Sequence, residues 1–163
     1  MQNVLIIVGT APCCKDDLRE FIHLYDKGCD FMAVGKDAAK LPIFWAYVAT
    51  GHAEDIPDIQ KVTAGNIIHY EQAPGVDIVQ AWDITPPTGS SAHLGALAAL
   101  TLGYKKIVLC GCPLHGPNPG HPGADYKMFQ DRWIQTKEAF LPYVRSMSGF
   151  TKGLLGAPEK DWL

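Results

Sequence analysis

The chain has 163 residues, of which 47% are hydrophobic and 19% charged, so it can bury a substantial apolar core. Its net charge of −3 excludes a basic field for nucleic acid or acidic membranes, and no apolar run reaches the ~20 residues that cross a bilayer. With no secretory signal pattern and five cysteines, we expect one cytoplasmic domain over residues 1–163 with reduced thiols. The low charge also favours a homo-oligomer.

The first half of the chain alternates short apolar runs with helix-like segments. Strands are predicted at Val4–Val8, Asp30–Val34, 44–49, 66–70 and 77–82, from their β-branched and aromatic content. Helices are predicted at 15–25, where Leu18, Phe21, Ile22 and Tyr25 share one face, at 35–37 and at 54–61. Pro57 is compatible with the first turn of the last of these helices.

Residues 88–112 form the most informative segment. A polar loop is followed by a helix of small residues, then by Gly103 where a glycine ends a helix, and then by the apolar run 107–109. A continuous apolar strand is typical of a parallel sheet that is covered on both faces. The segment therefore predicts a loop, helix and strand unit of an α/β sheet.

The last third of the chain begins with a proline- and glycine-rich loop at 115–123. An amphipathic helix is predicted at 125–141, a strand at 143–147, and a tail at 151–163 in which Trp162 is an anchor. The large aromatic residues are interpreted as core rather than as a base-stacking platform: Trp45, Tyr47, Phe129, Trp133 and Phe140.

Alternating strands and helices predict an α/β fold, a Rossmann-like three-layer sandwich with a mostly parallel sheet. In such sheets a ligand binds beyond the carboxyl ends of the strands, near the point where the strand order reverses. The loops that follow the predicted strands are therefore the candidate site.

Two of these loops carry the pattern of a phosphate site. Hydroxyls and a glycine precede the helix near residue 91, and the free N–H groups of a first helical turn attract anions; the alternative is an ordinary N-cap. The loop after the first strand lets the backbone approach a ligand, although it is neither a dinucleotide fingerprint nor a phosphate loop. The predicted ligand- and phosphate-binding residues are Gly9, Thr10, Ala11, Gly35, Lys36, Thr88, Gly89, Ser90, Ser91, His93 and Gly111.

His52 is the candidate acid or base, with Glu54 near enough in sequence to orient it; the alternative is a surface histidine. His115 and His121 lie in the long loop, which is interpreted either as a lid or as a rigid surface excursion. The spacing of Cys110 and Cys112 does not match the usual Cys-x-x-Cys pair, so no metal site is predicted. Mg²⁺ is left open as a cofactor.

Several segments carry a resemblance to a known family. Residues 4–13 resemble the strand and Gly-x-Gly-Pro-Ser loop that open the bacterial sialyltransferase-like proteins and the related MptE-like 6-hydroxymethylpterin diphosphokinases. Residues 31–38 resemble the second strand of these proteins. Residues 88–92 and 100–112 resemble their Thr/Ser-Gly-x-x-Ala and Leu-Gly-Tyr/Phe-Lys-x-Ile-x-Leu-x-Gly-x-Asp segments.

The resemblance implies a Rossmann-like sheet that binds a CMP-sugar in one branch, or ATP and a hydroxymethylpterin in the other. It also implies a small bacterial or prophage member. The chain departs from the family pattern where it has Cys13 for Ser, Gly35 for Asn and Cys112 for Asp. These are positions where the family contacts nucleotide or metal, so the departures bear on catalysis.

We therefore expect a protein that binds a small nucleotide or nucleotide-sugar at the carboxyl edge of the sheet, with glycosyl or diphosphoryl transfer as the reaction to test. The alternative is a non-catalytic homo-oligomeric assembly protein that retains the fold. A weaker alternative is a metal-dependent hydrolase that uses the His and Cys loops.

Overall fold

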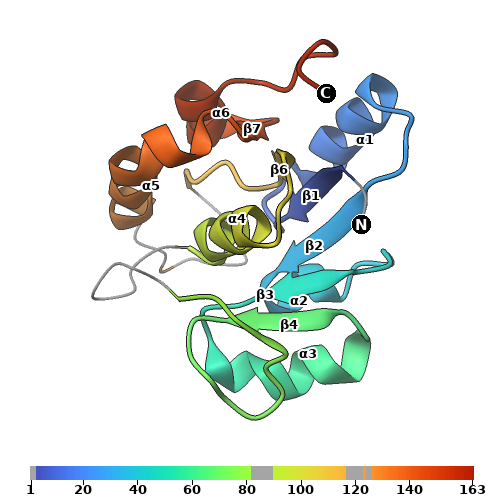
Figure 1. Cartoon of the computed structure of the whole chain (residues 1–163), viewed down its shortest axis with the longest axis vertical. Coiled ribbons are helices and arrows are strands. Elements are labelled where there is room, and N and C mark those ends of the chain that lie inside the picture. Colours follow the sequence, from blue (N-terminus) through green and yellow to red (C-terminus); the bar gives the residue numbers. More distant parts are fainter. Residues whose placement is uncertain (1–2, 82–89, 117–122, 124–125) are drawn as a thin grey trace.

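The computed structural model describes residues 3–81, 90–116, 123 and 126–163 (Figure 1). These residues form one seven-stranded sheet in the order β5-β4-β3-β2-β1-β6-β7, with every neighbouring pair parallel. The strands are β1 (Val4–Val8), β2 (Asp30–Val34), β3 (Tyr47–Ala49), β4 (Asn66–His69), β5 (Ile78–Val79), β6 (Lys106–Cys110) and β7 (Val144–Ser146). The predicted α/β fold is confirmed.

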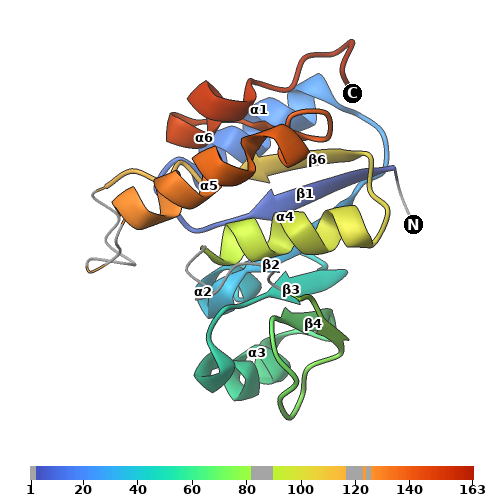
Figure 2. The ribbon, with the colours of Figure 1, turned by 60° about the vertical axis from the view of Figure 1, so that its left-hand side comes forward.

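Helices cover both faces of the sheet and give it two separate hydrophobic cores. One core contains residues of α1 (Cys14–Leu24), α2 (Gly35–Ala39) and α3 (Ile56–Val62), which follows the short helix η1 (Ala53–Asp55). The other core contains residues of α4 (Ser91–Thr101), α5 (Tyr126–Phe140) and α6 (Gly149–Leu155). Figure 2 shows α4 lying along the middle of the sheet, against β1, β2 and β3.

The order of the strands places a reversal between β1 and β6. The chain builds outward from β1 to β5 on one side, and returns through α4 to add β6 and β7 on the other. Because all seven strands are parallel, their carboxyl ends share one edge, and the loops from the two sides separate where β1 meets β6. This geometry locates the candidate site.

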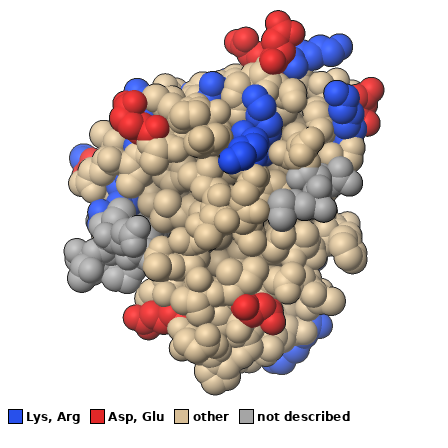
Figure 3. Space-filling view, viewed as in Figure 1, with Lys and Arg blue, Asp and Glu red and all other residues tan. Residues whose placement is uncertain are grey.

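The α4 helix has no charged residue, and it is packed like a core element. Most of its residues are buried, and Figure 3 shows few charged side chains over the middle of the face on which α4 lies. A Cβ at Gly95, on the sheet side, would lie 2.9 Å from the sulfur of Met32, so Met32 would have to shift to admit a larger residue. The small residues of α4 thus let the helix sit close to the sheet.

His93 joins α4 to α5 inside this core. The residue is fully buried, its Nε2 lies 2.9 Å from Oγ1 of Thr136, and its ring packs edge-on against Trp133 and Phe140. Burial, followed by the charge of Arg132, lowers the pKa of His93 to about 4. The imidazole therefore stays neutral in the folded protein at neutral pH.

Most predicted elements match the structure within a few residues. The strand predicted at 44–49 is shorter, since β3 begins at Tyr47; Trp45, just before it, is buried, and its Nε1 donates to the carbonyl of Ala39 at 3.1 Å. The helix α6 begins at Gly149 and overlaps the start of the predicted tail, where no helix was expected. Trp162 is an anchor as predicted, with its ring against Lys106 (4.4 Å to the ring centroid) and Arg145 (4.9 Å).

We expect folding stability to fall as the pH is lowered from about 6.5 to 4, because His93 binds a proton in the unfolded chain before it does in the folded one. The loss attributable to His93 should be about 3 kcal/mol, complete below pH 4. Denaturant unfolding of the wild type and of His93→Phe across this range measures it. Equal slopes for the two proteins would contradict the assignment.

Candidate functional site

The backbones of β1 and β6 come together directly after the two strands end. A Cβ on Gly9 would lie 2.4 Å from the carbonyl oxygen of Gly111, and a Cβ on Gly111 would lie 2.7 Å from the Cβ of Cys14. Gly9 N–H donates to the carbonyl of Cys110 at 2.8 Å, and Ala11 N–H donates to that of Gly111 at 3.3 Å. The two backbones thus pack directly against each other at the reversal point.

A buried carboxylate on α1 holds Gly111 in place. Asp17 is 5% exposed, and its Oδ2 accepts from the N–H of Gly111 at 2.8 Å and from the hydroxyl of Ser148 at 2.7 Å. The Ser148 hydroxyl also lies 3.2 Å from the sulfur of Cys13. Gly111 has φ +65°, a left-handed conformation that glycine adopts without strain.

The loop after β3 meets the amino end of α4. Ser90 caps the helix, since its hydroxyl accepts from the N–H of His93 at 3.3 Å. Ser91 accepts from the N–H of Gly51 at 3.2 Å, which fixes the β3 loop beside the first turn of α4. Thr50, fully buried, accepts from the N–H of His52 at 3.1 Å. The structure therefore joins Ser91, one of the predicted phosphate residues, to the loop that carries the predicted acid or base His52.

His52 and Glu54 form a contact pair at the surface. Nδ1 of His52 lies 3.2 Å from Oε1 of Glu54, and their side chains are 66% and 75% exposed. A backbone hydrogen bond and then the His52 contact lower the pKa of Glu54. The pair is exposed to solvent, and the two side chains are in contact; that Glu54 orients the imidazole for catalysis stays a prediction.

Lys36, on α2, forms an ion pair with Asp55 of η1, the short helix that follows the β3 loop. Its Nζ donates to Oδ1 of Asp55 at 2.7 Å, which raises the pKa of the Lys36 ammonium group. Gly35 has φ +80°, and a Cβ there would meet nothing within 4 Å. Glycine therefore suits this position because of its left-handed backbone conformation, not because of crowding, and the space beside its Cα is open.

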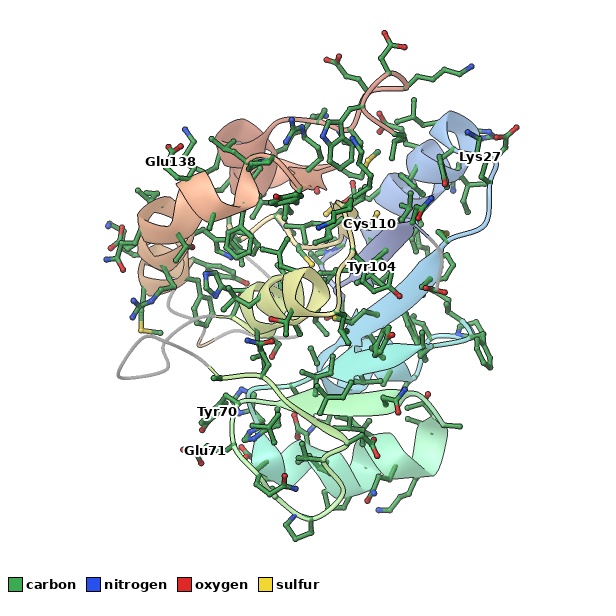
Figure 4. The ribbon with its side chains drawn as sticks, viewed as in Figure 1. Lys27, Tyr70, Glu71, Tyr104, Cys110 and Glu138 are labelled. Carbon is green, nitrogen blue, oxygen red and sulfur yellow. The ribbon has the colours of Figure 1, made fainter. Side chains whose placement is uncertain are left out.

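The remaining predicted site residues have different surroundings where the structure describes them. His93 is enclosed between α4 and α5, so its side chain serves helix packing. Thr10 is half-buried in the loop after β1, and His115 is exposed. Thr88, Gly89 and His121 lie outside the described residues. Figure 4 shows Tyr70 and Glu71 beyond the end of β4, pointing away from the sheet.

Four thiols lie near the reversal point, and all are held protonated. Burial raises the pKa of Cys13 and, together with the charge of Asp17, raises that of Cys14 to about 11. Burial also raises the pKa of Cys110 and Cys112. Across the described part of the chain, no group of His, Cys, Asp and Glu is arranged to hold a metal ion. Nor is any helix there long and apolar enough to span a bilayer.

Sequence reasoning missed Asp17, Ser148 and Asp55. Asp17 had a detectable signal, because it lies four residues before Phe21 and so shares the inward face of the predicted helix. Ser148 and Asp55 gave no such signal, since their roles depend on contacts with Asp17 and Lys36 that are distant in sequence.

No protein-family model matches the chain, and no curated protein matches it by sequence. Among solved structures it is similar to the sialyltransferase CstII from Campylobacter jejuni with the substrate analogue cytidine-5'-monophosphate. The TM-score is 0.61 at 14% identity, over 98% of this chain and 87% of that one. A CstII structure with CMP-3FNeuAc gives a TM-score of 0.61 at 13% identity, over 96% of this chain and 86% of that one.

At this level of identity the likeness establishes the fold. The chain has a Rossmann-like architecture similar to that of a sialyltransferase, in agreement with the family resemblance of its motifs. The resemblance to the pterin diphosphokinases stays a prediction.

Proposed function

We propose that this protein binds a nucleotide or nucleotide-sugar at the carboxyl edge of its sheet and transfers the glycosyl group. The observation that carries the proposal is the contact of Gly9 with Gly111, which joins β1 and β6 at the reversal of strand order, the place where parallel sheets bind ligands. The likeness to sialyltransferase structures containing CMP and CMP-3FNeuAc supports a cytidine nucleotide as the first ligand to test.

The charges favour α4 over α1 as the phosphate-binding helix. The first turn of α1 contains Asp16 and Asp17, whose negative charges oppose an incoming phosphate. The first turn of α4 has no acidic residue and begins with Ser90 and Ser91. A diphosphate or phosphate ester is therefore expected at the amino end of α4, where main-chain N–H groups attract anions.

The β3 loop supplies the group for acid–base chemistry in this proposal. Ser91 holds Gly51, and the next residue is His52, so the imidazole is carried on the loop that contacts the phosphate-binding helix. Glu54 orients the ring through Nδ1 and leaves Nε2 to accept a proton from an acceptor hydroxyl. Lys36 forms an ion pair with Asp55, so the pair adds no net charge to the site; its role is to hold the loop that carries His52 against α2.

Nucleotide binding is tested by thermal shift and calorimetry with CMP, CDP, UDP-sugars, ATP and 6-hydroxymethylpterin, with and without Mg²⁺. A ligand at about 100 times its Kd should stabilise the protein by about 2.7 kcal/mol. Removing both hydroxyls in Ser90→Ala/Ser91→Ala should weaken binding at least tenfold. Thr101→Ala, at the other end of α4, is the control and should bind normally.

If a well-folded sample binds none of these compounds, the proposed function fails and the non-catalytic assembly alternative takes its place. Selective binding of ATP and the pterin would favour diphosphoryl transfer instead. Unchanged affinity in the double serine variant would remove α4 from the site.

Catalysis is tested with His52→Asn. If His52 is the general base, release of CMP from a CMP-activated sugar should slow by about 10²- to 10⁴-fold, while the Kd for CMP stays within twofold. Initial rates and calorimetry on the same preparations separate the two effects. His23→Asn, an exposed histidine on α1, is the matched control. Equal rates for His52→Asn and the wild type would exclude His52 as the base.

A further inference from the structure

Each residue of the segment 111–114, directly after β6, forms a hydrogen bond through its backbone with a residue of one of three helices. The N–H of Gly111 donates to Asp17, and the hydroxyl of Thr151 donates to the carbonyl of Cys112 at 2.8 Å. Phe150 N–H donates to the carbonyl of Pro113 at 2.9 Å, and the Gln130 amide donates to that of Leu114 at 2.7 Å. These donors and acceptors come from α1, α5 and α6.

The same segment has an unusual backbone conformation. Leu114 has φ +51° and is the one non-glycine residue with positive φ among those the structure describes. Gly149, which has φ +67°, lies so close to the segment that a Cβ there would be 2.3 Å from the Cβ of Pro113. Such conformations persist only where the surroundings enforce them, and they cluster at functional sites.

Asp17 is the residue of this arrangement whose burial costs the most free energy, because it is a carboxylate. Its carboxylate is buried, and no ion pair within the described residues involves it. Although Asp17 belongs to α1, its side chain leaves its own helix and contacts the loops after β6 and β7. Burying a carboxylate is expensive, and its hydrogen bonds to an N–H and a hydroxyl are charge-assisted and offset that cost.

We infer that Asp17 is a positioning residue for the ligand site: it holds Gly111 in the left-handed conformation that brings β6 against β1 and so shapes the floor of the nucleotide site. This inference rests on the proposed function. Gly111 is held on both sides, since its N–H donates to Asp17 while its carbonyl accepts from Ala11. Loss of the carboxylate would leave the N–H of Gly111 and the hydroxyl of Ser148 without this acceptor.

The test compares Asp17→Ala, Asp17→Asn and Ser148→Ala by calorimetry with CMP and by amide exchange at Gly111 measured by NMR. Asp17→Ala should weaken CMP binding about tenfold and speed Gly111 exchange at least tenfold. Asp17→Asn keeps an acceptor oxygen and should restore most of both. Ser148→Ala removes one of the two donors and keeps the fold testable if Asp17→Ala fails to fold; it should weaken CMP binding severalfold.

The matched control is Tyr104→Phe at the opposite edge of the sheet, where the Tyr104 hydroxyl donates to Asp30 at 2.5 Å. This variant also loses a hydrogen bond of a largely buried group, so it reports general destabilisation. It should leave both CMP affinity and Gly111 exchange unchanged. A loss of affinity in Tyr104→Phe equal to that in Asp17→Ala would assign the effect of Asp17 to stability and overturn the inference.

The two proposals fail separately. If the wild type does not bind CMP or any other nucleotide probe, the proposed function is wrong, and Gly111 exchange alone then decides the role of Asp17. Unchanged Gly111 exchange in Asp17→Ala overturns the positioning role whatever the ligand. Faster exchange with unchanged CMP affinity would show that Asp17 holds Gly111 without shaping the site, and would also overturn the inference.

Discussion

The close approach of Gly9 to Gly111 is the constraint on which the rest of the candidate site depends. Only glycine fits at either position, because a Cβ would collide with main chain or with Cys14. This contact continues the pairing of β1 with β6 beyond the ends of the two strands, at the point where the strand order reverses. Both glycines are buried, and the carboxylate of Asp17 accepts a hydrogen bond from the N–H of Gly111.

The fold could be predicted because its signals are local. The apolar run of β1, the glycine that ends α4 and the stripe containing Trp133 and Phe140 each mark an element without reference to distant residues. The short elements were harder. β3 has only three residues, fewer than its apolar sequence predicts, and α6 packs against β7 and α5 without a sequence pattern of its own.

Some contacts within the candidate site could be predicted for the same reason, whereas its role as a ligand site stays a prediction. The hydroxyls that precede a helix indicated the Ser90 cap, and sequence spacing indicated the contact of Glu54 with His52. His93 has the pattern of a first-turn ligand residue, yet its side chain turns into the α4–α5 core, which spacing alone does not reveal. Asp17 acts on residues 94 and 131 positions away in sequence, so only the folded chain shows its role.

The central claim is that one ligand site lies at the carboxyl edge, where β1 meets β6 and α4 begins. An NMR titration of the labelled protein with CMP tests it most directly. The account predicts that the amides of Gly9, Ala11, Gly51, Ser91 and Gly111 shift together, with one shared affinity. Shifts centred instead on Asp30 and Tyr104, at the amino edge, would contradict it.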